Sequence, residues 1–468
     1  MIALRCGSQP GFADGFLEQA VGDFWEPWMR QADRLLEDEK LLSLVYEALL
    51  RRHPKSRTRG RLGFPAEMVL RLLLLKHLRN WSFAVVEREV RVNLLYREFT
   101  RVYAGQVPDA KTLGRQALSL GPEVIRQIQG RIVELAVENK VVQGRRMRVD
   151  TTVVETNIHF PTDSSLLGDG TRVLTRAMKK VTALAGATGT KMRDRSRSVK
   201  LRVLDIARAA RSKAPQSLEK LKQHYRKLLD ATSRVVGQAK RFSQEIRDGV
   251  KRGSDFMKQA ALEGLRQEID TMLPRVQQVI RQTKARILGG DTHAEGKIFS
   301  IFEPSTEIIR KGKAGKPNEF GKIVKVQEAE NQVVIGYEVY DQRPADSDLL
   351  IPAIAVHEER TGRKPDLAAA DAGFYSAKNE AEAKQQGVKQ VSVPNRSTKS
   401  AERRRYQKQR WFRKGQKWRT GCEGRISLLK RRHGLRRSLY KDEAGMKRWV
   451  GFAVIADNLI NIGKAMAR

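Results

Sequence analysis

Three carboxylates, Asp150, Asp371 and Glu423, stand in surroundings that suit metal-dependent chemistry on a phosphodiester. Such chemistry depends more on charge stabilisation than on covalent catalysis. Two metal ions about 4 Å apart can activate the incoming oxygen and stabilise the leaving one. Mg²⁺ prefers oxygen ligands and keeps several waters, so a few carboxylates can hold it. Acids with this role are expected at the ends of strands or helices, among cationic or apolar neighbours.

Asp150 lies within residues 148–156, a segment rich in β-branched side chains that predicts a strand. An acid there lowers the strand propensity and costs desolvation free energy if it is buried. A metal-binding role would explain it, and the alternative is a salt bridge to one of the arginines just before it. Glu155, in the same segment, is a second candidate ligand.

Asp371 ends the short apolar run 367–370 and is followed by Ala372 and Gly373. The carboxyl ends of strands in open α/β sheets are where ligand-binding groups collect, and small residues let a phosphate or a backbone come close. The alternative is a turn or cap aspartate, since aspartate favours such positions.

Glu423 is the only carboxylate between Arg403 and Lys441, a segment dense in Lys and Arg. A metal ligand at the centre of a phosphate-binding surface explains this isolation. The alternative is charge neutralisation, which contributes only about 0–1 kcal/mol at an exposed site. Ser427 and Lys430 follow four and seven residues later on the same helical face, so Lys430 could reach a phosphate beside the metal.

Aromatic residues lie within the same basic segment. Trp411 and Trp418 alternate with cations that include Arg413 and Lys414, a pattern that suits stacking on an unpaired base together with phosphate contacts. The alternative is that the two tryptophans anchor a loop into the core.

The overall charge points to a polyanion as partner. The 468 residues include 90 Lys and Arg against 53 Asp and Glu, a formal net charge of +37. The 40% hydrophobic content excludes a disordered polycation, and no apolar run of about 18 residues predicts a membrane span. The two cysteines, Cys6 and Cys422, have no metal-ligand spacing, which indicates a reducing cytoplasm.

The elements that must position these acids change along the chain. Residues 1–142 are expected to be helical, with Ser82 and Asp109 as helix caps and a break at Gly121-Pro122. Short helices with exposed arginines are compatible with a helix-turn-helix-like DNA-binding domain, and the alternative is a plain helical packing domain.

Residues 161–290 show helical periodicity and predict a long antiparallel hairpin, in which Pro274 should kink or interrupt the second helix. Its basic faces could touch DNA, or could simply be solvated. The strands and helices on either side imply an α/β mixed sheet interrupted by this insertion, with residues 143–160 and 291–468 forming one domain. The predicted strands are 148–156, 297–303, 333–340, 367–371 and 389–394.

Two helices are expected among the later strands, one capped by Ser347 and running to about residue 361, and one over residues 377–386. The loop at residues 311–316, rich in Gly and Lys, is a further candidate for phosphate contact.

Three segments in order resemble the DDE transposases of bacterial insertion sequences. They are VDTTVVE at 149–155, AADAGFY at 369–375, and the spacing of Arg419, Glu423 and Lys430. The tyrosine that the family usually has before this arginine falls on Gln416. The long helical insertion is similar to that of outlying members, such as the group left "not classified yet".

This resemblance implies a ribonuclease H-like catalytic core in which Asp150, Asp371 and Glu423 bind two Mg²⁺ or Mn²⁺ ions, and Arg419 and Lys430 grip phosphates. Water would attack at the element end, and the freed 3′-hydroxyl would then attack target DNA. The implied partners are double-stranded DNA with terminal inverted repeats, target DNA and a second copy or larger assembly of the chain, at the nucleoid in a bacterial cytoplasm. The alternatives are a non-catalytic nucleic-acid-binding protein and a structure-specific nuclease without strand transfer.

Overall fold

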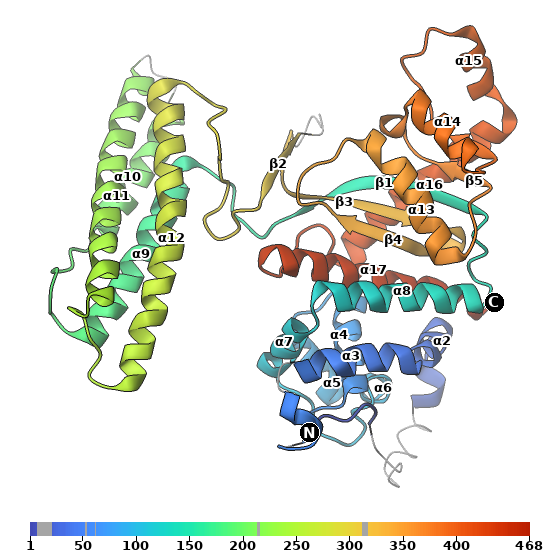
Figure 1. Cartoon of the computed structure of the whole chain (residues 1–468), viewed down its shortest axis with the longest axis horizontal. Helices are drawn as coiled ribbons and strands as arrows, with labels where there is room; N and C mark the ends of the chain where they lie inside the picture. Colours follow the sequence, from blue (N-terminus) through green and yellow to red (C-terminus); the bar gives the residue numbers. More distant parts are fainter. Residues whose placement is uncertain (7–20, 52–53, 61, 213–215, 311–316) are drawn as a thin grey trace. The chain divides into compact units, whose positions relative to one another are not determined.

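The computed structural model describes residues 1–6, 21–51, 54–60, 62–212, 216–310 and 317–468. Contacts between residues divide the chain into two compact units. One comprises Met1–Asn157 and Gly321–Arg468, and the other comprises Ile158–Phe320 (Figure 1). We call the first the sheet unit and the second the helical unit. No helix of the described residues is long and apolar enough to cross a membrane.

The first part of the sheet unit is helical, as expected. Its helices are α2 (Pro27–Leu35), α3 (Glu39–Arg51), α4 (Ala66–Leu78), α5 (Phe83–Val92), α6 (Leu94–Phe99), α7 (Ala110–Ser119) and α8 (Pro122–Glu138). The predicted caps are confirmed, because the Ser82 side chain accepts a hydrogen bond from the backbone of Val85 and Asp109 accepts from Lys111 and Thr112. Each cap satisfies N–H groups that the first helical turn leaves without a partner.

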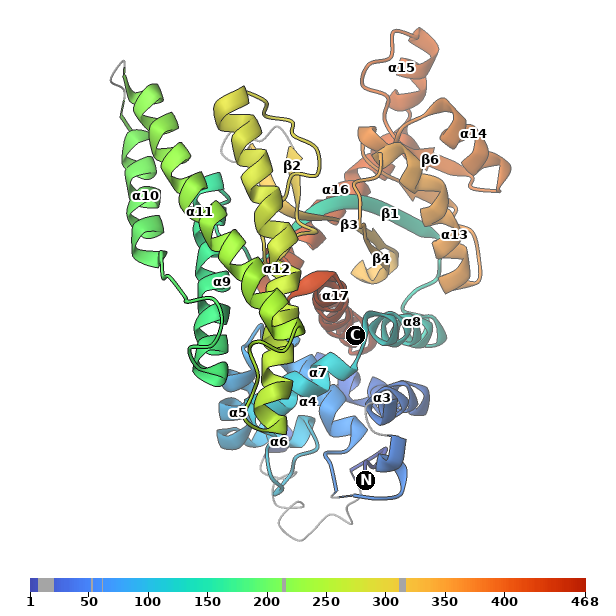
Figure 2. The same ribbon diagram turned by 60° about the vertical axis from the view of Figure 1, so that its left-hand side comes forward.

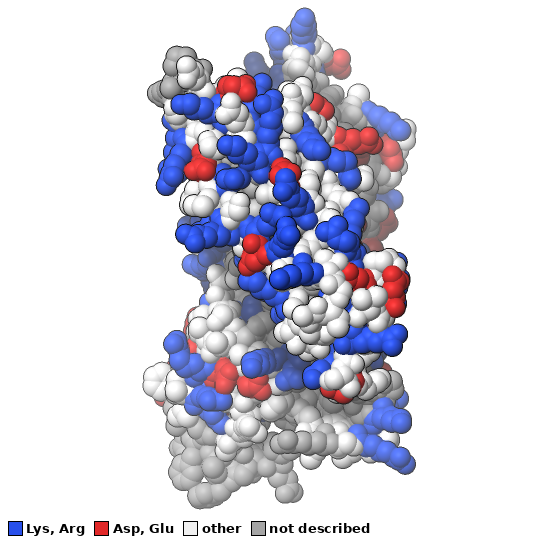
Figure 3. Space-filling model, turned by 90° about the vertical axis from the view of Figure 1, so that its left-hand side faces the viewer, with Lys and Arg blue, Asp and Glu red and all other residues white. Residues whose placement is uncertain are grey.

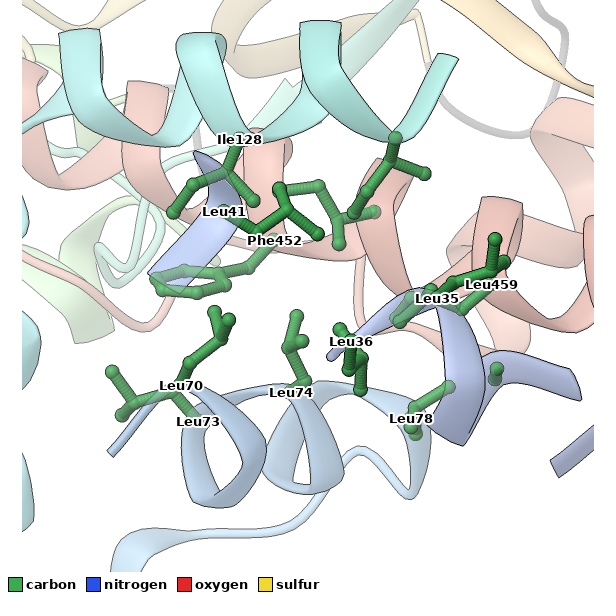
Figure 4. Packing of buried hydrophobic residues seen from close by; sticks show 14 of the residues in the cluster. Leu35, Leu36, Leu41, Leu70, Leu73, Leu74, Leu78, Ile128, Phe452 and Leu459 are labelled. Atoms are coloured by element: carbon green, nitrogen blue, oxygen red, sulfur yellow. The ribbon is translucent and has the colours of Figure 1, made fainter. Parts of the chain in front are cut away.

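These helices pack against the last helix of the chain, α17 (Asp442–Met466). In Figure 4, Leu70 and Leu74 of α4 lie in one cluster with Phe452 and Leu459 of α17 and with Ile128 of α8. The N-terminal helices therefore share a core with the C-terminal helix. That residues 1–142 act as a separate DNA-binding domain stays a prediction.

The sheet is mixed, which is the expected α/β class. Its strand order is β2-β3-β1-β5-β6, with β4 also paired to β3. Strand β1 is antiparallel to β3 and parallel to β5, and β5 is parallel to β6. The strands are β1 (Arg146–Glu155), β2 (Glu307–Arg310), β3 (Asn318–Glu328), β4 (Val334–Val339), β5 (Leu367–Ala369) and β6 (Gln390–Ser392).

The predicted strand at residues 297–303 is wrong, because these residues form no strand. Ile301 is buried in the core of the helical unit, and side chains of that unit's last helix replace strand hydrogen bonds. Gln282 bonds both the backbone N–H and C=O of Ile298, and Arg275 donates to the C=O of Ile301. The sequence analysis missed two strands, β2 and β3, which lie before and after residues 311–316. The lysine-rich loop predicted at these residues lies outside the described part of the chain.

Later helices cover the two faces of the sheet. Buried residues of α13 and α14 pack with Met147 and Val149 of β1, whereas those of α16 and α17 pack with Val154 of β1 on the opposite face. Because side chains alternate along a strand, Asp150 belongs to the face of Val154, toward α16. These helices are α13 (Leu350–Thr361), α14 (Ala377–Gln385), α15 (Ala401–Lys408) and α16 (Arg410–Arg432).

Ser347 does not cap α13, contrary to the prediction. It lies inside the 3-10 turn η4 (Asp346–Leu349), which leads directly into the helix, and its hydroxyl donates to Asp348. A side-chain cap acts at an extended residue just before a helix. The first turn of α13 instead continues from a preceding helical turn, so there is no such position for Ser347 to fill.

A buried ionic network fixes α16 and α17 to the strands. Glu328 of β3, which is fully buried, accepts from Arg148 of β1 at 2.7 and 2.9 Å and from Arg425 of α16 at 3.3 Å. Arg425 also donates to both carboxylate oxygens of Asp457 in α17, at 2.8 and 3.0 Å. A single charge inside a core is costly unless it is paired and hydrogen-bonded, so these partners hold the helices in place.

The described part of the helical unit contains four helices, α9 (Asp163–Ala185), α10 (Ser196–Ala209), α11 (Ser217–Arg247) and α12 (Phe256–Gly289) (Figure 2). The two helices expected for the hairpin are α11 and α12, which follow each other and share a core; α9 and α10 are additional helices that the hairpin alone did not include. Pro274 does not interrupt α12. It lies on the exposed side of the helix, while Leu273 and Val276 beside it are buried in the core and hold the turn together.

Lys76 of α4 is a buried amine in the sheet unit. Its Nζ lies 5.2 Å from the ring centroids of Phe83 and Tyr440 and 4.7 Å from that of Trp449. Burial lowers the pKa of Lys76 from 10.5 to about 7, because desolvation penalises the charged form.

Between pH about 7 and 10.5 the unfolded chain therefore binds a proton on Lys76 that the folded chain does not. The free energy of unfolding should rise with pH in this window, by up to about 1.4 kcal/mol per pH unit. Urea unfolding at several pH values should show that Lys76→Met removes this rise, whereas Lys111→Met, at an exposed lysine of α7, keeps it. Equal pH slopes for the wild type and Lys76→Met would contradict the assignment.

Replacing Arg425 by methionine leaves Glu328 and Asp457 buried without this partner. We expect a loss of about 3–5 kcal/mol in the free energy of unfolding, measured by denaturant titration. Arg431→Met, at an exposed arginine of the same helix, should change it by less than about 0.5 kcal/mol. A loss from Arg425→Met no larger than that of the control would show that the network does not hold α16.

Candidate active site

Two of the predicted acids belong to neighbouring parallel strands: Asp150 lies within β1, and Asp371 comes just after β5. The register pairs Met147 with Ala368 and Arg148 with Ala369, the last paired residue of β5 before Asp371. Asp371 follows β5 directly and caps the 3-10 turn η5 (Ala372–Phe374), where its Oδ1 accepts from the N–H of Gly373 at 2.9 Å. The cap role considered for Asp371 is thus observed, and it occupies one carboxylate oxygen.

The third acid comes from α16, which lies close against the sheet. A Cβ atom added to Gly415 would lie 2.7 Å from Cβ of Ser392 in β6, and one added to Gly421 would clash with the guanidinium of Arg148. A side chain at position 415 would collide with Ser392, and one at position 421 would have to displace the guanidinium of Arg148. The side chain of Glu423, two residues after the second glycine, is 60% exposed.

One guanidinium joins the strand acid to the helix acid. Arg419 of α16 is 2.8 Å from Oε1 of Glu423 and 3.5 Å from Oδ2 of Asp150. The Arg419 side chain is 10% exposed and that of Asp150 is 14% exposed. Asp150 and Glu423, which are 273 residues apart in sequence, therefore converge on the same positive charge.

The salt bridge considered as an alternative role for Asp150 exists, but with a different arginine from those expected. Arg148 points its guanidinium at Glu328, and Asp150 pairs with Arg419. The second candidate ligand, Glu155, pairs with Arg437 at 3.0 Å. Across the described residues, no group of three or more His, Cys, Asp and Glu side chains is close enough to hold a metal ion. Two of the three predicted acids thus share a cation without a three-carboxylate cluster.

A fourth carboxylate, which the sequence analysis missed, adjoins the other side of this region. Oδ1 of Asp346 accepts from the hydroxyl of Thr151, next to Asp150, at 3.2 Å. A Cβ atom added to Gly373 would lie 3.2 Å from Oδ2 of Asp346 and 3.2 Å from Oδ1 of Asp371. Asp346 therefore contacts both the strand of Asp150 and the loop of Asp371. In the sequence it looks like an ordinary residue ahead of a helix, and only its position in space marks it.

The departure at Gln416 has a structural explanation. Its Nε2 donates to the backbone C=O of Ala370 at 3.2 Å and to that of Ser392 at 2.5 Å. Both carbonyls lie where β5 and β6 end. Gln416 therefore ties α16 to the carboxyl ends of these two strands, where Asp371 also lies.

The aromatic and basic residues of α16 divide into two groups. Trp418 is half-buried under Arg148 and Arg146, with its ring centroid 4.9 and 5.6 Å from their guanidinium carbons, which agrees with the anchoring alternative. Trp411 packs edge-on against Tyr406, at 5.4 Å between ring centroids. Both tryptophans belong to a helix and not to a loop.

Arg413 and Lys414, in contrast, are exposed. Arg413 lines a groove of about 540 Å³ together with Arg396, Arg404 and Gln416. Because Gln416 also bonds the ends of β5 and β6, this cationic groove begins beside the loop of Asp371. Lys430, the other predicted phosphate contact, lies half-buried near the end of α16.

Two family models match the chain. The first, described as Transposase domain (DUF772), matches residues 26–116. The second, described as Transposase DDE domain, matches residues 296–459. Asp371 and Glu423 lie within the second match, and Asp150 lies outside both. No curated protein and no solved structure was found to match. The two domains follow each other in one chain, which therefore belongs to the DDE transposases of insertion sequences, enzymes that act on DNA and depend on divalent metal ions.

Proposed function

We propose that Asp150, Asp371 and Glu423 are the catalytic carboxylates with which this transposase cleaves DNA at the ends of its element and joins them to target DNA. One observation carries the proposal: a single guanidinium, that of Arg419, pairs with both Asp150 and Glu423. Acids from a strand and a helix that approach one positive charge are suited to sharing a cation. Asp371 comes just after β5, the strand that pairs in parallel with the strand of Asp150.

The donor set fits the metal dependence of the family. All three side chains offer carboxylate oxygens, the ligands that Mg²⁺ and Mn²⁺ prefer, and we infer two such ions at this site. When bound, they would supply activation of the attacking oxygen and stabilisation of the leaving oxygen. In the described structure Arg419 neutralises two of these carboxylates, and its Nε is buried without a hydrogen-bond partner in the described part of the chain.

Arg419 has a second role in this proposal. If Asp150 and Glu423 held metal ions, the guanidinium of Arg419 would be free to bind a phosphate of the DNA. Arginine binds phosphate oxygens through paired, charge-assisted hydrogen bonds. Arg419 would then orient the phosphate, and Lys430 on the same helix would bind a neighbouring one.

The cationic groove beside the site suits the path of a DNA strand. Arg396, Arg404 and Arg413 line it, and three cations along one groove can neutralise successive phosphates. Lys414 and Trp411 lie on the same helix as Arg413, and we include them in this surface.

We infer that the sheet is a ribonuclease H-like core, formed by residues 143–160 and 291–468 and interrupted by the helical insertion. The N-terminal helices, which the first family model matches, would bind the terminal inverted repeats. Transposition joins two ends of one element, so the protein would act as a dimer or a larger assembly.

The carboxylate assignment is tested by Glu423→Gln, which keeps the size of the side chain and removes its charge. Cleavage of DNA that carries the element's ends, measured with Mg²⁺, should fall by about 100-fold or more. Asp150→Asn and Asp371→Asn should behave alike.

The matched control is Glu402→Gln, at an exposed acid of α15, which should keep the wild-type rate. Thermal unfolding and DNA affinity of the variants should stay close to those of the wild type. Normal cleavage by Glu423→Gln would refute its catalytic role.

We also propose Asp346 as a positioning residue, because it contacts Thr151 beside Asp150 and the loop of Asp371. Asp346→Ala should lower the cleavage rate. It should also raise the Mn²⁺ concentration needed for half-maximal cleavage. The combined loss in cleavage at a fixed, low Mn²⁺ concentration should be about 10–100-fold. Asp346→Asn keeps a hydrogen-bond acceptor and should restore much of this loss. Asp348→Ala, at an exposed neighbour, is the control. An unchanged Mn²⁺ requirement in Asp346→Ala would contradict the positioning role.

A further inference from the structure

The outward side of α9 is almost entirely basic. The exposed residues of this helix are Arg172, Arg176, Lys179, Lys180 and Ala183. The other three cations follow Arg172 by four, seven and eight residues, so all four lie on one side of the helix. Surfaces of ordinary proteins intersperse both signs of charge, and this side carries one sign.

Helix α10 extends this surface. Lys179 forms an ion pair at 2.6 Å with Asp194, just before α10, and a Cβ atom added to Gly168 would lie 3.4 Å from Val203. The start of α10 thus lies beside the later part of α9, and the two helices run antiparallel. We call the combined surface the basic face of the helical unit; it comprises Arg172, Arg176, Lys179, Lys180, Arg193, Arg197 and Lys200.

Few carboxylates neutralise the basic face. Asp169 pairs with Arg172 and Asp194 with Lys179. Within the described part of the chain, the other members of the face form no ion pair. Residues 158–320 contain 34 Lys and Arg against 17 Asp and Glu, and Figure 3 shows a side of the molecule on which Lys and Arg far outnumber Asp and Glu. The helical unit therefore carries twice as many Lys and Arg as Asp and Glu.

We propose that the basic face binds the backbone of duplex DNA, outside the DNA held at the active site. The cations of α9 span roughly 12 Å along the helix, and duplex DNA carries about seven charges over such a length. The face offers no exposed Asn or Gln on α9 to read base edges. Lys and Arg contacts to phosphates position DNA without selecting its sequence, so the binding is independent of sequence and sensitive to salt.

This surface would let the enzyme bind DNA beyond the segment held at the active site. A transposase must hold DNA that flanks the cut as well as the phosphate that reacts, and the helical unit departs from the sheet between Asp150 and Asp371 in sequence. An insertion at this point can present a second DNA-binding surface without altering the strands that carry the acids.

The test measures DNA affinity of the full-length chain by fluorescence anisotropy in EDTA, with duplexes of unrelated sequence at several NaCl concentrations. Arg176→Gln combined with Lys180→Gln should weaken binding about tenfold or more. It should also make the slope of log affinity against log salt less steep by about 1.8, the value for two lost phosphate contacts. The matched control is Lys227→Gln combined with Lys240→Gln, which removes two exposed lysines of α11.

The control should bind within about twofold of the wild type. Equal losses in both double variants would mean a general charge effect and would overturn the proposal, as would an unchanged salt slope in the first variant. Wild-type DNA affinity in the first variant, together with lost binding to anionic phospholipid vesicles, would assign the face to a lipid surface instead. Because binding is measured without metal, failure here is distinct from failure of the carboxylate assignment.

Discussion

The buried carboxylate of Glu328 is the constraint on which the active site depends. It is the last residue of β3, opposite Arg148 of β1, and it accepts hydrogen bonds from Arg148 and Arg425. Removing three charges from water costs several kcal/mol for each ion, and only close, well-oriented partners offset this cost. Arg148 of β1 and Arg425 of α16 must therefore both reach Glu328. This requirement places helix α16 across the sheet, next to Asp150.

That arrangement gives α16 its several functions. The close contacts of Gly415 and Gly421 bring the helix down onto the sheet, and Gln416 ties it to the ends of β5 and β6. Arg419 then lies within reach of a strand acid and of Glu423, one turn further along its own helix. The same helix thus carries an acid suited to a metal ion and a cation suited to phosphate, and their mutual pairing keeps each neutralised within a strongly cationic protein.

Local chemistry was predicted well. Ser82 and Asp109 cap their helices, and β5 and β6 lie where short apolar runs occur. The Ser347 cap was wrong for a local reason, because a 3-10 turn leads directly into α13. Two other errors arose where contacts with distant residues decide the structure. Residues 297–303 are rich in Ile and Phe, as strands often are, but their backbone bonds to Gln282 and Arg275 of a helix. Pro274 was expected to interrupt a helix that core packing keeps continuous.

The sequence by itself determined the basic charge, the order of the three acids, the isolation of Glu423 and the resemblance to DDE transposases, because composition and short motifs are local properties. Only the tertiary structure decided that Asp150 pairs with Arg419 and not with Arg148, that Asp346 lies beside the loop of Asp371, and that four basic residues share the outer side of α9 next to α10. These contacts join residues that are tens to hundreds of positions apart. They depend on strand register and helix packing, which periodicity along the chain does not specify.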